Sequence, residues 1–212
     1  MQTIMLGTRN RKKRAEMAEI LGDLPVILGD LNDRPDVPEV EETGETFEAN
    51  ARLKAQAVAR ATGEWTLGED SGLVVPGLNG RPGVRSARYA GPQCDDEANN
   101  TRLLAELAPL PSDLRAAYYV CVAVLADHAG EVRAVTEGRC HGVIATERRG
   151  TNGFGYDPLF LIPEFHQTFG ELSPRVKQAL SHRARALESM RRWIVRLGLC
   201  SAPAGAAPNT AH

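Results

Sequence analysis

The pattern of apolar and polar positions predicts alternating strands and helices in the first third of the chain. Residues 3–7 form a short apolar run typical of a buried strand, and residues 26–28 predict a second strand. Between them, apolar residues recur at i, i+3, i+4 and i+7, which predicts an amphipathic helix over 10–22. Gly22 and Pro25 then mark its end.

An alanine-rich stretch predicts a second helix over 45–61, with Gly63 as its stop signal. Residues 65–75 then read as a strand that Gly-Glu-Asp-Ser-Gly interrupts, and residues 76–92 read as a long loop rich in glycine and proline. The residues expected on the inner side of the second helix are Phe47, Leu53, Ala57 and Val58.

The second half contains the strongest strand signal, over 116–126, and a turn at 127–130 leads to its predicted hairpin partner at 132–143. Strands that alternate with helices early and pair as a hairpin late predict an α/β fold with a mixed sheet. We expect one domain over 1–199 and a disordered tail over 200–212. The remaining predicted elements are a helix over 95–107, a short strand over 159–162, and a last helix that begins at Ser173-Pro174 and breaks near Ser181.

Composition narrows the functional classes. The formal net charge of −2 argues against a basic nucleic-acid binder and requires any anion site to be local. No apolar run approaches the roughly 20 residues that span a bilayer, and the first residues do not resemble a signal peptide. Four cysteines without a C-x-x-C pair make a zinc site unlikely and favour a reduced, cytoplasmic location.

The stretch TRNRKKR, from Thr8 to Arg14, follows the first strand and opens the first helix. A helix N-terminus carries partial positive charge, so five cations there are unfavourable unless an anion binds beside them. The flexible glycines of a Walker A motif are absent. On this pattern alone, a phosphate site, a solvated basic turn and a nucleic-acid patch all remain open.

Acidic residues occur where an apolar strand is expected. Glu69 and Asp70 lie inside the strand over 65–75, and buried charges are costly unless they are paired or bind a metal. Glu41 and Glu42 precede the second helix. Carboxylates suit Mg²⁺, which often takes one or two of them together with substrate phosphates.

The roles of several other polar and aromatic residues are ambiguous when each residue is considered alone. Asn50 and Lys54 lie at i and i+4 on one helix face and could be an ordinary polar edge. The turn GFGYDP, over 153–158, could stack a base or could fill the core. Lys177, Ser181, His182 and Arg183 gather hydrogen-bond donors near the break in the last helix.

The order of these segments is more specific than any one of them. T-x-N-x-x-K, EETG-x-TF-x-x-NA-x-x-KA, DSGL, PGV-x-SARYAG, GFGYDP and K-x-x-LSHR follow one another in register over residues 3–198. Together they resemble the inosine triphosphate pyrophosphatase family, the noncanonical purine nucleoside triphosphate pyrophosphatases. The resemblance covers nearly the whole chain.

The resemblance implies an elongated two-lobed α/β fold, with a central mixed sheet flanked by helices and a nucleotide cleft between the lobes. It implies a homodimer that requires Mg²⁺ and cleaves ITP, dITP or XTP to the monophosphate and pyrophosphate. Nucleic acid and membrane are not expected partners.

The resemblance also assigns roles to residues. Asp70 matches the general base, and Glu41 and Asp70 match the Mg²⁺ ligands. The triphosphate is expected to lie against Thr8, Arg9, Asn10, Arg11, Lys12 and Lys13, with Asn50, Lys54 and Ser71 nearby. The base and sugar are expected to lie against Phe154, Gly155, Tyr156, Asp157, Lys177, His182 and Arg183.

One departure from the family pattern concerns Glu69, where aspartate is usual, so a metal role for Glu69 is not inferred. Within the first segment, Thr8, Asn10 and Lys13 match the motif, whereas the other cations exceed it. Two other hypotheses are a non-catalytic nucleotide sensor and a nucleic-acid binder that uses TRNRKKR. The complete set of Glu41, Lys54 and Asp70 argues against the first, and the net charge argues against the second.

Overall fold

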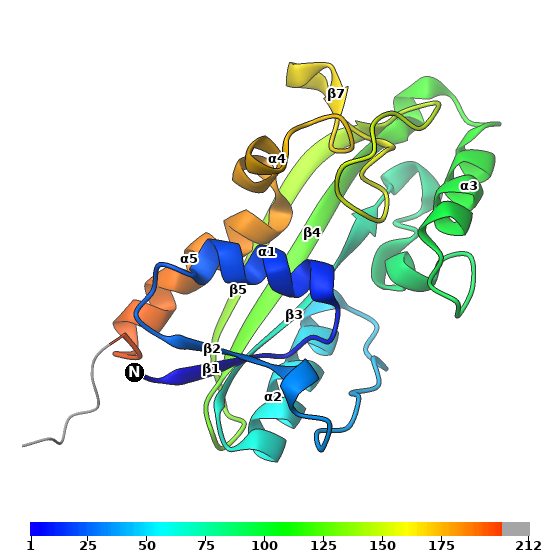
Figure 1. Cartoon of the computed structure of the whole chain (residues 1–212). Helices are drawn as coiled ribbons and strands as arrows, with labels where there is room; N and C mark the ends of the chain where they lie inside the picture. Colours follow the sequence, from blue (N-terminus) through cyan, green and yellow to red (C-terminus); the bar gives the residue numbers. More distant parts are fainter. Residues whose placement is uncertain (201–212) are drawn as a thin grey trace, which may run out of the picture.

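The computed structural model describes residues 1–200 and contains one seven-stranded mixed sheet in the order β2-β1-β3-β4-β5-β6-β7 (Figure 1). Its strands are β1 (Thr3–Leu6), β2 (Ile27–Asp30), β3 (Trp65–Val74), β4 (Ala116–Ala126), β5 (Val132–Ile144), β6 (Phe160–Ile162) and β7 (Gln167–Thr168). Its α-helices are α1 (Arg11–Leu21), α2 (Phe47–Thr62), α3 (Asp96–Leu107), α4 (Pro174–Leu180) and α5 (His182–Arg196).

The sheet changes direction at β3. β1 pairs in parallel with β2 and with β3, whereas each pairing from β3 to β7 is antiparallel. The long β4–β5 hairpin therefore forms the axis of an elongated molecule (Figure 1). The prediction of an α/β fold with a mixed sheet is confirmed.

Two helical layers and two separate cores give the molecule its two halves. α1 and α5 pack together on one face of the sheet, and α2 covers the other face (Figure 1). One core gathers around Leu6, Leu67 and Leu187 beneath α1 and α5. A second core, around Tyr119 and Phe160, lies at the other end of β4 and β5. Functional groups on β3 and β4 thus lie where the two cores adjoin.

The expected interruption of the strand over 65–75 is wrong. β3 runs through Gly-Glu-Asp-Ser-Gly without a break and pairs with β4 in continuous register. Successive side chains of a strand point to opposite faces, so Glu69 and Asp70 enter different layers of the protein. A Cβ at Gly68 would lie only 2.6 Å from the Ala51 carbonyl oxygen, so this glycine lets α2 approach the sheet closely.

The inner face predicted for α2 is partly wrong. Leu53 and Ala57 are exposed, whereas Ala51, Ala55 and Ala59 are fully buried. Because small residues allow the helix backbone to approach Gly68, this packing selects alanine over leucine. The same face buries Asn50 and Lys54, which the apolar pattern alone could not place inward.

The last helix breaks where the sequence indicates. Ser181 ends α4 and its side chain caps α5, so the two helices meet at an angle beside the sheet. Of the predicted tail over 200–212, residues 201–212 lie outside the described residues. Within the described part, no helix has the length and apolarity that a membrane crossing requires.

Candidate active site

A cavity of about 190 Å³ lies where the two cores adjoin. The N-terminus of α1, the middle of β3, the turn over 154–157 and the α4–α5 junction all contribute to its wall. The predicted site residues that line it are Asn10, Lys13, Asp70, Ser71, Phe154, Gly155, Tyr156, Asp157, Lys177, His182 and Arg183.

Asp70 lies on the α2 side of β3, and only 4% of its surface is exposed. Its two carboxylate oxygens accept hydrogen bonds from the Lys54 ammonium at 3.1 Å and from the Asn50 amide at 3.2 Å. Burial raises the pKa of the Asp70 carboxyl, and the nearby lysines only partly oppose it. The i, i+4 pair of α2 is therefore part of the site.

Glu42 forms the second carboxylate contact of Lys54, at 2.8 Å, and its other oxygen lies 3.5 Å from the Arg88 guanidinium. Lys54 lowers the pKa of Glu42 against the opposing effect of burial. The neighbouring Glu41, predicted as a metal ligand, is exposed and does not line the cavity. The sequence-based prediction named Glu42 beside Glu41 but assigned the metal role to Glu41, because adjacent glutamates in a loop give no signal for which one points inward.

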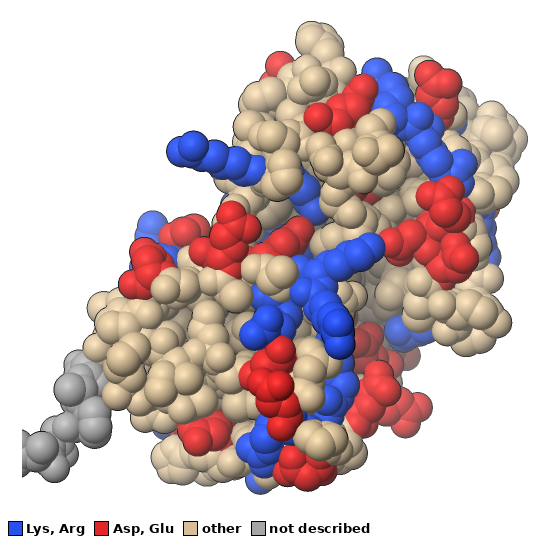
Figure 2. Space-filling model, viewed as in Figure 1, with Lys and Arg blue, Asp and Glu red and all other residues tan. Residues whose placement is uncertain are grey.

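The TRNRKKR stretch begins α1 through an N-cap. The Asn10 side chain accepts hydrogen bonds from the backbone N–H groups of Lys12 and Lys13, at 3.0 and 3.1 Å. Thr8 in turn accepts from the Asn10 backbone N–H at 3.2 Å. Figure 2 shows Lys and Arg side chains gathered over this end of α1, with acidic side chains facing them.

The five cationic side chains of that stretch have different positions and partners. Arg9 donates to the backbone carbonyls of residues 31, 34 and 37, and Arg14 lies 2.6 Å from Asp30, so both hold the edge of the sheet. Lys12 lies at the rim, 3.9 Å from Asp96. Arg11 is exposed. Of the five, only Lys13 lines the cavity.

Glu69 points to the face of β3 that α1 and α5 cover. It lies 2.8 Å from Lys13 and 3.5 Å from Arg183, and it accepts a hydrogen bond from the Cys121 thiol at 3.3 Å. Although burial opposes ionisation, these two cations hold the pKa of Glu69 well below its usual range. Glu69 therefore links Lys13 to an arginine of the opposite wall.

The opposite end of the cavity is built around Asp157. Its carboxylate accepts from the Lys177 ammonium at 2.7 Å, from the Phe154 backbone N–H at 2.8 Å and from the Tyr119 hydroxyl at 3.4 Å. Burial raises the pKa of the Asp157 carboxyl despite these donors, which favour the ionised form. This set of donors fixes the turn that carries Phe154, with the Lys177 ammonium 4.8 Å from the centre of its ring.

The same turn is held from α3 by two residues that sequence reasoning missed. The Asp96 carboxylate accepts from the Gly155 backbone N–H at 2.9 Å, and the Asn100 amide donates to the Gly155 carbonyl at 2.9 Å. Gly155 has φ +61°, a conformation that favours glycine. Both backbone polar groups of Gly155 are thus fixed beside Phe154.

His182 and Arg183 complete this wall. The His182 ring stacks on Tyr119 at a centroid distance of 4.7 Å, and its buried Nδ1 has no hydrogen-bond partner among residues 1–200. Burial, reinforced by Arg183, lowers the pKa of His182 well below its usual range, so the ring is neutral at pH 7. Arg183 donates to the Ser71 hydroxyl at 2.9 Å and pairs with Glu16.

Comparison with known proteins identifies the family. The sequence profile of the Ham1 family matches residues 4–193. The chain belongs to the Ham1 family. It is 51% identical over 194 residues to a protein of Rhodopirellula baltica named dITP/XTP pyrophosphatase, a match that covers 92% of this chain and 93% of that protein. A protein of the same name from Geobacter sulfurreducens is 49% identical, with coverage of 88% and 94%.

A solved structure supports the same assignment. The HAM1 protein of Coxiella burnetii superposes with a TM-score of 0.85 at 41% identity, covering 92% of this chain and all of that one. The resemblance inferred from the ordered motifs is confirmed, and the Ham1 fold is that of the sheet described above.

The groups at the Asp70 end of this Ham1 site fit a divalent cation that arrives with substrate. Within residues 1–200, no three carboxylate, histidine or cysteine groups form a ready metal cluster. Two buried or half-buried carboxylates, Glu42 and Asp70, nevertheless share the single ammonium of Lys54. Mg²⁺ commonly binds through one or two carboxylates plus substrate phosphates, which matches this donor set.

Proposed function

We propose that the chain is a Mg²⁺-dependent nucleoside triphosphate pyrophosphatase that converts ITP, dITP and XTP to the monophosphate and pyrophosphate. One observation carries this proposal: a single cavity joins a cationic helix start and the buried Asp70 at one end to Phe154, His182 and Arg183 at the other. The names of the relatives, dITP/XTP pyrophosphatase, support dITP and XTP among these substrates.

The phosphate end suits attack of water at the α-phosphorus. The Asp70 carboxylate has a raised pKa, so it binds a proton more tightly than an ordinary aspartate does. It can therefore accept the proton of the attacking water. Lys13 and Lys54 offset the phosphate charge that would repel the water. Mg²⁺, held by Asp70 with Glu42 or Glu41, would polarise the phosphates and stabilise the leaving pyrophosphate.

The base end suits a purine with a 6-oxo group. Lys177 and Arg183 carry only donors, and the neutral His182 ring can donate through one nitrogen. Adenine presents an amino donor at position 6, which leaves the protein donors unpaired and can cost several orders of magnitude in kcat/KM. Phe154 provides an aromatic face for stacking.

Two further properties rest on the family resemblance. We propose that the enzyme acts as a homodimer in the cytoplasm. Sedimentation equilibrium at micromolar concentrations tests the first property, and twice the mass of 23.0 kDa is the expected result. A monomer mass would contradict it.

The activity is tested by pyrophosphate release from ITP, dITP, XTP, ATP and GTP, each with Mg²⁺ and with EDTA. We expect Mg²⁺-dependent release from the first three substrates, at rates at least about 100-fold above that from ATP. Equal kcat/KM for ITP and ATP would overturn the proposed specificity. Binding of ITP without release of pyrophosphate would favour the nucleotide-sensor hypothesis.

A further inference from the structure

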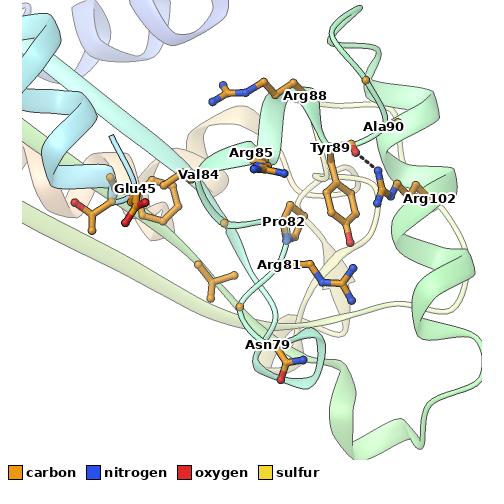
Figure 3. A pocket seen from close by; sticks show the side chains of 16 residues that line it. Glu45, Asn79, Arg81, Pro82, Val84, Arg85, Arg88, Tyr89, Ala90 and Arg102 are labelled. Carbon is orange, nitrogen blue, oxygen red and sulfur yellow. Dashed lines mark hydrogen bonds between the residues drawn. The ribbon is translucent and has the colours of Figure 1, made fainter. Parts of the chain in front are cut away.

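An arginine-lined groove lies beside the 3₁₀ helix over Gly83–Arg88, outside the catalytic cavity (Figure 3). Its volume is about 680 Å³, and the only residue that lines both it and the catalytic cavity is Val84. The guanidinium groups in its wall come from Arg81, Arg85, Arg88 and Arg102.

Two of these arginines share one carboxylate. Arg81 and Arg102 lie 2.9 and 2.8 Å from Glu106, which also accepts from the Tyr89 hydroxyl at 2.6 Å. Arg102 stacks on the Tyr89 ring at 4.5 Å. Burial, together with the hydrogen bond to Glu106, raises the pKa of Tyr89 to about 12. Two cations against one carboxylate leave a net positive charge at this end of the groove.

The other two arginines have weaker partners or none. Arg88 is 3.5 Å from Glu42, whose nearer partner is Lys54 at 2.8 Å. Arg85 is exposed, and its side chain makes no ion pair or hydrogen bond within residues 1–200. The single carboxylate in the groove wall is that of the exposed Glu45. The groove therefore has more positive than negative charge.

We propose that this groove binds a small phosphate-bearing polyanion of the size of pyrophosphate. The planar guanidinium group donates two parallel hydrogen bonds to phosphate, so arginine is favoured where phosphate is recognised. Phe47, Val74 and Pro82 provide apolar walls, which reduce the screening of these charges by water.

Free pyrophosphate and the phosphate chain of a nucleotide offer this same chemistry. Neither requires hydrolysis, so the proposal goes beyond the catalytic function and does not depend on it. A second protein surface rich in carboxylates is the other candidate occupant, and the experiment below distinguishes it.

The test is isothermal titration of the full chain with inorganic pyrophosphate in metal-free buffer, followed by the same titration with ITP in Asp70→Asn. Arg85→Gln removes the unpaired cation of the groove, and Lys13→Gln removes a cation of the catalytic cavity. Arg192→Gln is the matched control, because Arg192 is also exposed but lies on α5.

We expect wild type to bind two pyrophosphate ions per chain. Arg85→Gln should weaken one of the two sites by about tenfold or more, as expected for loss of a charged hydrogen-bond partner, and Lys13→Gln should weaken the other. Arg192→Gln should retain both. If ITP also occupies two sites in Asp70→Asn, the groove can bind a nucleotide. If ITP occupies one site while pyrophosphate occupies two, the ligand of the groove is free pyrophosphate.

Pyrophosphate binding that Arg85→Gln leaves unchanged, or that Arg85→Gln and Arg192→Gln weaken equally, would overturn the proposal. A changed sedimentation coefficient in Arg85→Gln with unchanged pyrophosphate binding would identify the groove as a protein-contact surface instead. If the protein binds two pyrophosphate ions but does not hydrolyse ITP, the proposed catalytic function fails and the proposed groove site does not. The two proposals can therefore fail separately.

Discussion

The cavity has a buried lysine–aspartate pair at each end, and the two pairs differ in what else holds the carboxylate. Lys54 lies 3.1 Å from Asp70, and Lys177 lies 2.7 Å from Asp157. Burial raises the pKa of both carboxyls. Asp157, however, also accepts from a backbone N–H and from a tyrosine hydroxyl, whereas within residues 1–200 the only other donor to Asp70 is the Asn50 side chain.

We propose that this difference separates a reactive carboxylate, Asp70, from a structural one, Asp157. A carboxylate has about four lone-pair positions, and the donors around Asp157 use most of them on the turn that carries Phe154. Asp70 lines the cavity with unused acceptor capacity beside Lys54 and Glu42. The pair with fewer donors can take part in proton transfer and metal binding, and the pair with more donors fixes geometry.

The largest expected effect concerns catalysis at the Asp70 end. Asp70→Asn keeps the shape of the side chain but cannot accept the proton of the attacking water, so kcat for ITP should fall by about 10²–10⁴-fold. The free energy of unfolding should fall less than in the Asp157 variant described next, because Lys54 keeps Glu42 as a partner and Asn50 is the one other donor that is affected in the described residues. Steady-state kinetics and urea denaturation measure the two quantities. A variant with wild-type kcat would exclude Asp70 as the general base.

The corresponding change at the other end should mainly affect stability. Asp157→Asn leaves the buried Lys177 with Glu16 as its remaining partner and weakens three donors at once, so we expect a loss of about 3 kcal/mol in the free energy of unfolding. Asp70→Asn, measured in the same urea titration, is the matched control. If Asp157→Asn unfolds at the wild-type urea concentration, the distinction between the two carboxylates is lost.

The cations of TRNRKKR extend the comparison to smaller effects. Lys13 lines the cavity, whereas Arg11 is exposed and does not. Lys13→Gln should therefore lower kcat/KM for ITP by about 10–100-fold, the loss expected for one charge-assisted hydrogen bond. Arg11→Gln, the matched control on the same helix turn, should lower it by less than about threefold through weaker electrostatic attraction of substrate. Equal losses in the two variants would show that total charge matters more than position.

The strands, the helices and most of the cavity wall were predictable from the sequence, because periodicity and ordered motifs carry that information. Several features were not, and three of them show why. The inward face of α2 is set by contact with Gly68, which the apolar pattern does not encode. The choice between Glu41 and Glu42 depends on loop geometry, and Arg9 is directed outward by carbonyls more than 20 residues along the chain. Long-range contacts decide each of these.

The smallest expected effect tests whether the Asp157 end is held by an uncharged His182. Its pKa is lowered well below 6.5, so in the native state the ring stays neutral while the unfolded chain takes up a proton below pH 6.5. Stability should therefore fall as pH drops through 6.5, by about 1.4 kcal/mol between pH 7.5 and 5.5 from this group. His182→Phe preserves the stack on Tyr119 without titrating, and its urea midpoint should depend less on pH by that amount. If His182→Phe and wild type lose equal stability, the native ring takes up a proton as readily as in the unfolded chain, and the donors proposed to select a 6-oxo purine must be assigned without a neutral histidine.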